Sequence, residues 1–358
     1  MRTNRLPGRT LHMLIAVLAI SALALAACDE VDDAVDDIDD DEEEVAEEEE
    51  VEEDEEEEVD DDPPADVDAQ ALTLGTGSTG GTYFPLGGAI AGVWNGHVDG
   101  ASVSTQATGA SVENVRLLQA GELNLAMAVN GVAADAYAGE GEFEGEDIDL
   151  AVLGNVYGEV MQVVARADAG IETIDDMDGM RVAIGPPGSG TEVLARQLLE
   201  YHDIDPDNDI ESFSDTFGDA ADNLRDGQVD AAFAILALPA ASIEEVATAT
   251  DISLVSIEGE ALDAALDADE TLSVLEVEPG TYPGQDDPAT FVTNWATMYV
   301  QPDLDEDLVY DLTRVLYEEN EEIAAAHAVG EQIQLDTAVD GLGGIPLHPG
   351  AERYYDEQ

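Results

Sequence analysis

One glycine-rich loop, residues 72–88, constrains the fold more than any other part of the chain. Its sequence, LTLGTGSTGGTYFPLGG, leads from an apolar strand over residues 71–74 into glycines and small hydroxyl residues, and an apolar segment follows as far as Trp94. Glycine lets a backbone approach a ligand closely, and the free N–H groups at the start of a following helix attract anions. The loop therefore predicts a binding site for a small, polar, anionic molecule. The residues expected to contact that molecule are Ser78, Thr79, Gly81, Thr82 and Tyr83.

A dinucleotide cofactor is the alternative that this loop raises. Residues 75–80 match G-x-G-x-x-G directly after a strand, which is the pattern of a dinucleotide-binding turn. However, Thr82, Tyr83 and Pro85 crowd the first turn. The acid that should bind the ribose has only one loosely placed candidate, Asp99. We therefore expect no cofactor.

A second loop of the same kind occurs at residues 185–192. Its sequence, GPPGSGTE, precedes a helix expected over residues 193–201. Two facing helix N-termini offer partial positive charge to one or two carboxylates. One such loop is weak evidence for a site, whereas a pair, one in each half of the body, is stronger evidence. The residues expected to contact ligand here are Gly188, Ser189, Gly190 and Thr191.

Strands and helices alternate along the rest of the first half. Residues 101–108 alternate like a strand, residues 109–118 form a turn and a helix, and residues 121–130 form a third strand. This order predicts a doubly wound α/β lobe, whose ligands bind beyond the carboxyl ends of the strands. The residues expected at that edge are Thr108, Ser111 and Asn130.

The body is long enough for two lobes. In the crossing segment, residues 150–166, Tyr157 and Glu159 are expected to line the hinge. A buried strand at residues 231–239 ends at the cleft with Pro239, and Phe233 on it is either a wall of the ligand site or a core residue. We therefore expect two α/β lobes with a ligand cleft between them. The expected division is lobe 1 at residues 70–166, lobe 2 at residues 167–290, and a return to lobe 1 with C-terminal helices at residues 291–358.

The first 28 residues are expected to be a lipoprotein signal peptide. Three arginines precede an apolar run over residues 11–27, which Cys28 follows. Cys28 is the only cysteine, so no disulfide forms within the chain, and it is the expected lipidation site. A plain secretory signal is the alternative. The next run, residues 29–62, is almost entirely Asp and Glu, which predicts a disordered acidic tether that extends to residue 69.

Charge is the strongest compositional feature. The formal net charge is −74, and the ten basic residues are all arginine. No nucleic acid partner is expected, because a phosphate backbone is repelled by such a surface. Charge of this size also repels itself in dilute buffer, whereas molar salt screens it within about 3 Å. The composition is typical of a protein from a halophilic organism.

Several motifs together resemble the TAXI family, the extracytoplasmic solute-binding subunits of one class of TRAP transporters. The resemblance covers residues 70–357. Ala110 stands where the family pattern would have glycine. The motifs that carry the resemblance are GTGSTGGTY and PLGG within residues 75–88, TGASVEN at residues 108–114, the Asp-Ala-Ala strand that begins at Asp230, and IPLHPGAERYY at residues 345–355.

The resemblance implies a periplasmic-binding-protein-like fold that captures a small organic acid, such as glutamate or a C4–C5 dicarboxylate, without enzymatic activity. It also implies a TRAP membrane subunit as partner, uptake driven by an ion gradient, and a location in the periplasm or on the outer face of the cytoplasmic membrane. From the residues themselves, we expect both loops to hold carboxylates, with Tyr83 and Tyr157 packed on the carbon chain. An arginine is the alternative clamp, because guanidinium binds carboxylate bidentately.

An extracytoplasmic hydrolase or transferase on the same scaffold is the second function considered, with Ser78 or Ser189 as nucleophile. Such an enzyme needs a base beside the serine, and neither loop contains histidine or lysine. The histidines after the signal segment are far apart and lack metal-ligand spacing. Residues 205–216 begin like a calcium loop but lack its glycine and its bidentate glutamate. We therefore expect neither catalytic residues nor a metal site.

Overall fold

The structure, a computed structural model, describes residues 69–146 and 148–358 of the chain. These residues belong to one compact unit, Pro64–Gln358, and the preceding unit, Met1–Pro63, lies outside the described residues. The predicted signal peptide, the predicted lipidation site Cys28 and nearly all of the predicted acidic tether fall on the part that is not described. Within the described ranges, every helix is too short or too polar to cross a bilayer.

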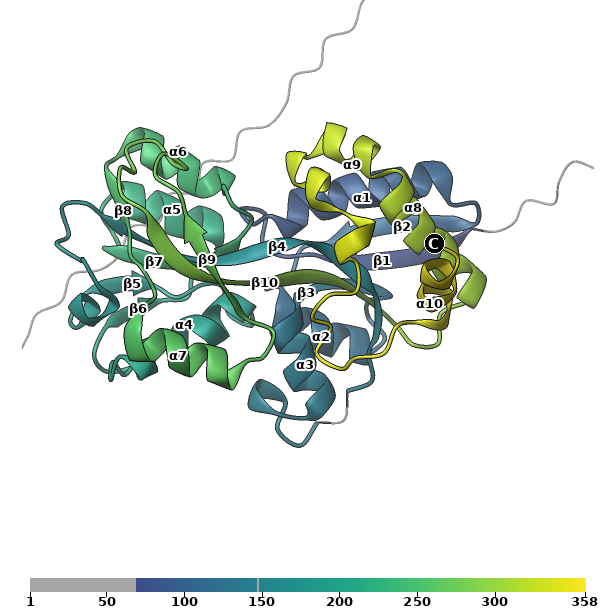
Figure 1. Ribbon diagram of the computed structural model, residues 1–358, viewed down its shortest axis with the longest axis horizontal. Helices are drawn as coiled ribbons and strands as arrows, with labels where there is room; N and C mark the ends of the chain where they lie inside the picture. The colour runs from purple at the N-terminus through teal and green to yellow at the C-terminus, as the bar shows by residue number, and fades with distance from the viewer. Residues whose placement is uncertain (1–68, 147) are drawn as a thin grey trace, which may run out of the picture. The chain divides into compact units, whose positions relative to one another are not determined.

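One mixed sheet runs through the body (Figure 1). In the described residues it has ten strands, which follow the order β2-β1-β3-β10-β4-β7-β5-β6, with β8 paired to β4 and β9 paired to β10. The strands are β1 (Gln70–Gly75), β2 (Ala101–Gln106), β3 (Leu125–Val129), β4 (Ala151–Arg166), β5 (Arg181–Ala183), β6 (Glu211–Phe213), β7 (Ala231–Leu236), β8 (Ile252–Leu254), β9 (Ser273–Val277) and β10 (Ala289–Val300).

Two groups of parallel strands share one internal order. β1 lies between β2 and β3, and β5 lies between β6 and β7, with parallel pairing throughout. The long strands β4 and β10 run antiparallel to each other and join the two groups, because β10 also pairs with β3 and β4 with β7. We call residues 70–150 together with 301–358 the first half, and residues 167–288 the second half.

Helices cover both faces of the sheet in each half (Figure 1). This is the arrangement of a wound α/β fold, in which each parallel strand is followed by a crossover helix. The helices of the first half are α1 (Tyr83–His97), α2 (Ser111–Gln119), α3 (Asn130–Ala138), α8 (Glu306–Glu318), α9 (Asn320–Ala326) and α10 (Pro349–Asp356). Those of the second half are α4 (Gly190–Tyr201), α5 (Phe217–Arg225), α6 (Ala241–Ala249) and α7 (Gly259–Ala268).

The inner strands are apolar along their whole length because both of their faces are covered. β3 reads LAMAV and β7 reads AAFAIL, and every residue of both is buried. β3 is shorter than the strand expected at residues 121–130, and Asn130 is already the first residue of α3. The lobe boundaries expected from the sequence remain a prediction.

Candidate ligand-binding site

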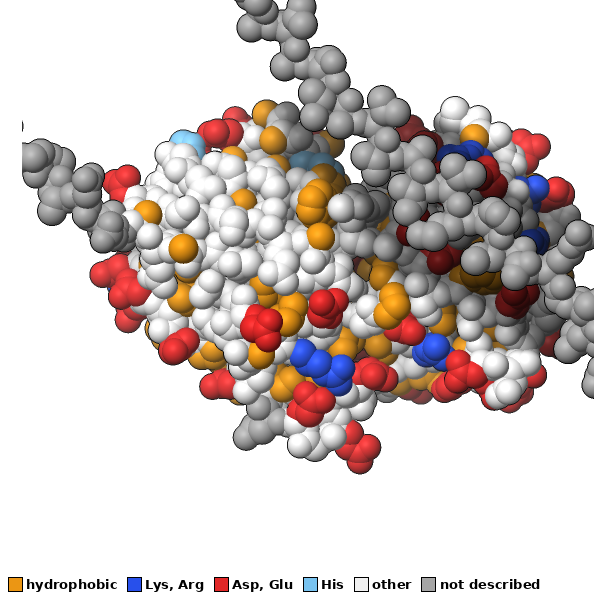
Figure 2. Space-filling model, turned by 180° about the vertical axis from the view of Figure 1, so that it is seen from behind, with side chains coloured by type: hydrophobic (Ala, Val, Ile, Leu, Met, Phe, Trp, Pro, Cys, Tyr) orange, Lys and Arg blue, Asp and Glu red, His pale blue; other side chains and the backbone are white. Residues whose placement is uncertain are grey.

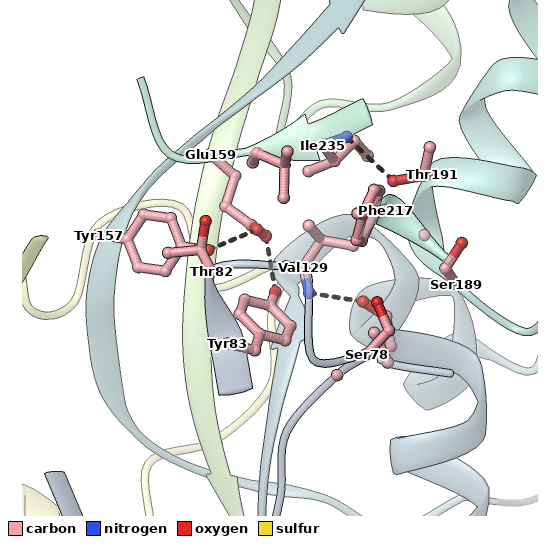
Figure 3. A pocket seen from close by; sticks show the side chains of 16 residues that line it. Ser78, Thr82, Tyr83, Val129, Tyr157, Glu159, Ser189, Thr191, Phe217 and Ile235 are labelled. Carbon is pink, nitrogen blue, oxygen red and sulfur yellow. Dashed lines mark hydrogen bonds between the residues drawn. The ribbon is translucent and has the colours of Figure 1, made fainter. Parts of the chain in front are cut away.

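A small cavity lies between the two halves, where the loops after β1, β2, β5 and β6 meet (Figure 3). These loops follow the carboxyl ends of parallel strands, which is where wound α/β folds bind ligands. β4 crosses the same place and adds two side chains to the wall. The lining residues are Gly77, Ser78, Gly81, Thr82, Tyr83, Ala110, Ser111, Val129, Tyr157, Glu159, Ser189, Gly190, Thr191, Phe217, Ile235 and Leu236.

The helices α1, α2, α4 and α5 all begin at this cavity. Their first residues, in that order, are Tyr83, Ser111, Gly190 and Phe217, and each of the four lines the wall. The first turn of a helix has N–H groups without partners inside the helix, and the helix dipole gives that end partial positive charge. The helix starts therefore make the cavity attractive to an anion.

Hydroxyl groups provide further donors on the wall. Oγ of Ser78 is buried and has no hydrogen-bond partner in the described structure. Oγ1 of Thr191 accepts the N–H of Ile235 at 3.0 Å, and Oγ of Ser111 accepts the N–H of Val129 at 3.2 Å. Because these two oxygens already accept, each hydroxyl keeps its proton for a second partner. Figure 3 shows the bond between Thr191 and Ile235.

Glu159 of β4 brings a carboxyl group to the opposite wall. Its side chain is 3% exposed. Oε2 accepts the hydroxyl of Tyr83 at 2.6 Å, and Oε1 accepts the hydroxyl of Tyr157 at 2.9 Å (Figure 3). Burial raises the pKa of Glu159 to about 7, although the two tyrosine hydrogen bonds act to lower it. A cation placed here would hold the carboxylate in its ionised form.

Two tyrosines hold this carboxyl group in place. The rings of Tyr83 and Tyr157 meet edge to face, with centroids 6.2 Å apart and planes at 78°. Burial, followed by the nearby charge of Glu159, raises the pKa of both phenols well above their usual range. Both hydroxyls therefore stay protonated and act as donors to Glu159.

Arginine is absent from the wall, although it was one candidate for the ligand clamp. Each arginine in the described ranges forms an ion pair with a carboxylate, and none lines this cavity. An anion in the cavity is thus met by helix starts and hydroxyls rather than by a guanidinium. The paired arginines are Arg116, Arg166, Arg181, Arg196, Arg225, Arg314 and Arg353.

The structure brings most of the predicted contact residues to this one cavity, from segments as far apart as residues 78 and 191. Both glycine-rich loops take part, together with Tyr157 of the crossing strand β4. The predicted residues on the wall are Ser78, Gly81, Thr82, Tyr83, Ser111, Tyr157, Ser189, Gly190 and Thr191.

Three predicted residues lie just outside the cavity. Thr79 and Pro239 line a separate, wider groove on the other side of the first loop. The carbonyl of Gly188 accepts hydrogen bonds from the N–H groups of Val112 and Glu113 at 3.0 and 3.2 Å. It therefore caps the N-terminus of α2 from the opposite half. Gly188 therefore joins the two halves beside the cavity.

Two more predicted residues hold the backbone around the site. Thr108 donates its hydroxyl to the carbonyl of Thr76 at 3.0 Å and to Oδ1 of Asn114 at 2.7 Å. Asn130 is fully buried, and its Nδ2 donates to the carbonyl of Gly341 at 2.6 Å. Both side chains thus use their polar atoms within the protein.

Seven wall residues were not predicted as ligand contacts, and two of them, Glu159 and Phe217, carry the arguments below. Glu159 was expected only at the hinge, yet it is the one charged residue in the apolar run of residues 150–165, which is a signal that could have pointed to the site. Phe217 is the first residue of α5, and nothing in its local sequence marks it. Phe233, by contrast, lies in the core, which was the second of its two expected positions.

The two halves touch each other around the cavity. Gly80 of the first loop packs on the backbone of Phe217 and Gly218, and Gly81 packs on the ring of Phe217. Gly109 lies against the carbonyl of Pro187 in the same way. A side chain on Gly80 would overlap the backbone of Gly218, so glycine is needed there for the halves to come this close.

Comparison with known families gives one match over most of the chain. The model of the NMT1-like family matches residues 74–358, which is nearly the whole described body. The match begins inside β1 and includes both glycine-rich loops and the crossing strand with Glu159.

Solved structures with a similar fold include PhnD1 from Prochlorococcus marinus in complex with methylphosphonate, at 10% identity and a TM-score of 0.50, covering 74% of this chain and 91% of that one. A protein from Bordetella bronchiseptica is 16% identical with a TM-score of 0.50, covering 80% and 82%. The periplasmic aliphatic sulphonate binding protein SsuA from Escherichia coli is 16% identical with a TM-score of 0.41, covering 80% and 79%. The first two confirm the predicted binding-protein-like α/β fold.

Proposed function

The chain belongs to the NMT1-like family, and we propose that it is an extracytoplasmic solute-binding protein that captures a small amino acid for a membrane transporter. The cavity between its two halves is the proposed ligand site. A solved structure of the same fold, PhnD1, is a complex with a small anion, methylphosphonate. The proposal extends that mode of binding to this chain, with a different ligand.

One observation carries the proposal: a single small cavity contains groups for both charges of a zwitterion. The starts of α1, α2, α4 and α5 and the free hydroxyl of Ser78 suit a carboxylate. The buried carboxyl of Glu159 suits an ammonium group, because an opposite charge within a few ångströms stabilises its ionised form. An α-amino acid supplies both groups on one carbon atom.

This pairing separates the two ligand classes expected from the sequence. Glutamate carries an ammonium group for Glu159 as well as carboxylates for the helix starts. A C4–C5 dicarboxylate brings only negative charge, and it would have to lie beside a second buried carboxyl group. Like charges in one site disfavour ionisation. The proposed ligand is therefore glutamate or a similar amino acid rather than a dicarboxylate.

The proposed transporter partner and the proposed location outside the cytoplasmic membrane rest on the sequence motifs. The TAXI-like motifs support a TRAP membrane subunit as the partner and uptake driven by an ion gradient. A lipid on Cys28 and an acidic tether would hold the body outside the cytoplasmic membrane. The charge of −74 supports a halophilic source, in which molar salt screens the surface.

A serine hydrolase or transferase is the alternative that the same cavity must be tested for. Ser78 and Ser189 both line the wall, but no histidine or lysine of the described residues lines it with them. The one carboxyl group on the wall, Glu159, accepts hydrogen bonds from two tyrosines rather than from a serine. A nucleophilic serine needs an adjacent base, so binding without turnover is the better supported function.

Isothermal titration in molar salt tests the proposal with glutamate, glutamine, succinate and 2-oxoglutarate. We expect binding of the amino acids and recovery of the ligand unchanged after long incubation. Ser78→Ala should weaken binding at least tenfold with unchanged thermal stability, because its hydroxyl has no partner in the protein. The neighbouring Thr79→Ala is the control and should bind normally, since Thr79 faces the other groove. Binding of succinate but not glutamate, or turnover of any ligand, would contradict the proposal.

A further inference from the structure

A second cavity lies directly behind the proposed ligand site. It lies between β7 and the helices α5 and α6 of the second half. Apart from Ser242, every residue that lines it is apolar. Its walls include Val164, Leu224, Phe233, Ala234, Ile243 and Val246.

Two side chains stand between this apolar cavity and the polar one. Phe217 and Leu236 line both cavities. Phe217 is 8% exposed and Leu236 is 2% exposed, so both side chains are buried between the two cavities. In Figure 3 the Phe217 ring points toward the centre of the polar cavity, between Val129 and Ile235.

The position of the Phe217 ring is fixed from both halves. Its own helix, α5, is capped by Thr216, whose hydroxyl accepts the N–H of Asp219 at 3.2 Å. From the first half, Gly81 lies against the ring, and a β-carbon on Gly81 would collide with it. The ring is thus a wall that is completed only when the two halves come together.

We infer that Phe217 determines the length of the ligand by separating the polar cavity from the apolar one. The inference rests on the proposed function, because it takes the head of the ligand to be an α-amino acid held by the helix starts and Glu159. A short side chain stops at the Phe217 ring. A longer, apolar side chain would need the space behind it, and the ring blocks that space.

The test compares ligands of increasing length. The probes are the straight-chain 2-amino acids from 2-aminobutyrate to 2-aminooctanoate, and n-octanoate as a probe without the ammonium group, titrated into the whole protein. Phe217→Ala removes the ring and joins the two cavities. Phe217→Leu opens the wall less and keeps more of the packing. Phe233→Ala is the matched control, because Phe233 lines the apolar cavity alone.

We expect the wild type to bind 2-aminooctanoate more weakly than the short-chain 2-amino acids of the series. Phe217→Ala should bind 2-aminooctanoate at least tenfold more tightly than the wild type does, since each buried methylene is worth roughly a fourfold gain. Phe217→Leu should show a smaller gain in the same direction. Phe233→Ala should keep the length profile of the wild type, because the wall is intact.

The outcomes separate the inference from the proposed function. An unchanged length profile in both Phe217 variants overturns the inference, and so does an equal gain in Phe233→Ala. A wild type that binds neither glutamate nor any of these straight-chain 2-amino acids overturns the proposed function. In that case a gain in n-octanoate binding by Phe217→Ala still supports Phe217 as the wall between the cavities.

Discussion

Glu159 places a carboxyl group in the same small cavity as the starts of four helices. Its two oxygens are both held by tyrosine hydroxyls, and its side chain is almost completely removed from water. In an empty cavity the protonated form is favoured up to about pH 7, because burial raises the pKa of this carboxyl group. A bound ammonium group would reverse this preference, which makes the residue a discriminator between amino acids and dicarboxylates.

The stability of the unliganded protein should therefore depend on pH through Glu159. Its pKa in the folded protein is about 7, against 4.5 for an unperturbed glutamate. The folded protein keeps the proton that the unfolded chain releases, so the free energy of unfolding should fall as pH rises from about 4.5 to 7 and then level off. The loss from this one group should be about 3 kcal/mol.

Urea denaturation at several pH values, with wild type and Glu159→Gln compared, measures this effect. Other acids contribute to both proteins, so only the difference between the two curves belongs to Glu159. We expect that difference to grow in favour of Glu159→Gln toward pH 7. Parallel curves would mean that Glu159 titrates normally.

Ala110 is the second residue with a specific consequence. It precedes α2 with φ 78° and ψ −139°, a conformation that favours glycine, and it is the position where the motif led us to expect glycine. Holding a non-glycine residue there costs about 1–3 kcal/mol, and the extra chain entropy of glycine offsets part of the gain. Ala110→Gly should raise the free energy of unfolding by about 1 kcal/mol.

The control for Ala110→Gly is Ala120→Gly at the other end of the same helix. Ala120 has ordinary helical angles, φ −73° and ψ −9°, so glycine brings no relief there. Chemical denaturation should show that Ala110→Gly has a higher free energy of unfolding than the wild type. Ala120→Gly should have the same free energy of unfolding as the wild type or a lower one. Equal losses in both variants would rule out strain at Ala110.

At the scale of elements, the helices around the cavity differ in how their first turns are satisfied. α4 has a side-chain cap, in which Oγ of Ser189 accepts the N–H of Glu192 at 3.1 Å. α1 and α2 have none. For α2, the carbonyl of Gly188 in the opposite half replaces the missing cap. The helix starts are therefore partly left for a ligand and partly used to join the halves.

Ser189→Ala should have two separate effects. Loss of the cap should lower the free energy of unfolding by about 1 kcal/mol. Loss of a hydroxyl on the cavity wall should also weaken amino acid binding. The matched control is Asp305→Ala, which removes the cap of α8 at the N–H of Leu308 but lies away from the cavity. Calorimetry and denaturation on both variants should show similar losses of stability and a loss of affinity in Ser189→Ala alone.

At the scale of the whole body, the two halves share β4 and β10 and meet again around the cavity. The meeting points are glycines, because only a residue without a side chain allows the backbones to approach so closely. One contact joins Gly80 of the first loop to Gly218. The other joins Gly109, just before α2, to Pro187. Closure of the cavity thus depends on a few positions far from each other in the sequence.

Gly80→Ala should separate closure from folding. Its β-carbon would overlap the backbone of Gly218, so ligand affinity should fall at least tenfold, while the ligand-free protein should remain folded. Gly88→Ala in α1 is the control, since no atom lies within 4 Å of its β-carbon. That variant should bind normally and gain roughly 0.5–1 kcal/mol of stability from better helix propensity.

Calorimetric titration measures the affinities, and X-ray scattering with and without ligand measures the compaction of the body. The wild type and Gly88→Ala should become more compact on binding, and Gly80→Ala should do so less. Full affinity in Gly80→Ala would show that close contact at this point is not required.

The two loops and the α/β class of this protein can be read from short stretches of its sequence. A strand, a glycine-hydroxyl loop and a helix start are encoded within about twenty consecutive residues, so the two loops and the α/β class could be predicted from residues 72–88 and 185–192. Nine of the residues selected in this way lie on one cavity. The excess of acidic residues is likewise a property of composition and needs no fold.

Which side chains meet depends on how the whole chain packs. Ser78 and Thr79 are neighbours in the loop, yet they face different cavities, because the direction of each side chain depends on how the turn packs against the opposite half. Tyr83 and Glu159 are 76 residues apart, and their hydrogen bond exists because the fold brings β4 to the start of α1. Phe217 becomes a wall through its contact with Gly81, which no local pattern encodes. Contacts between distant segments come from the packing of the whole chain, and they give the cavity its charge and its length.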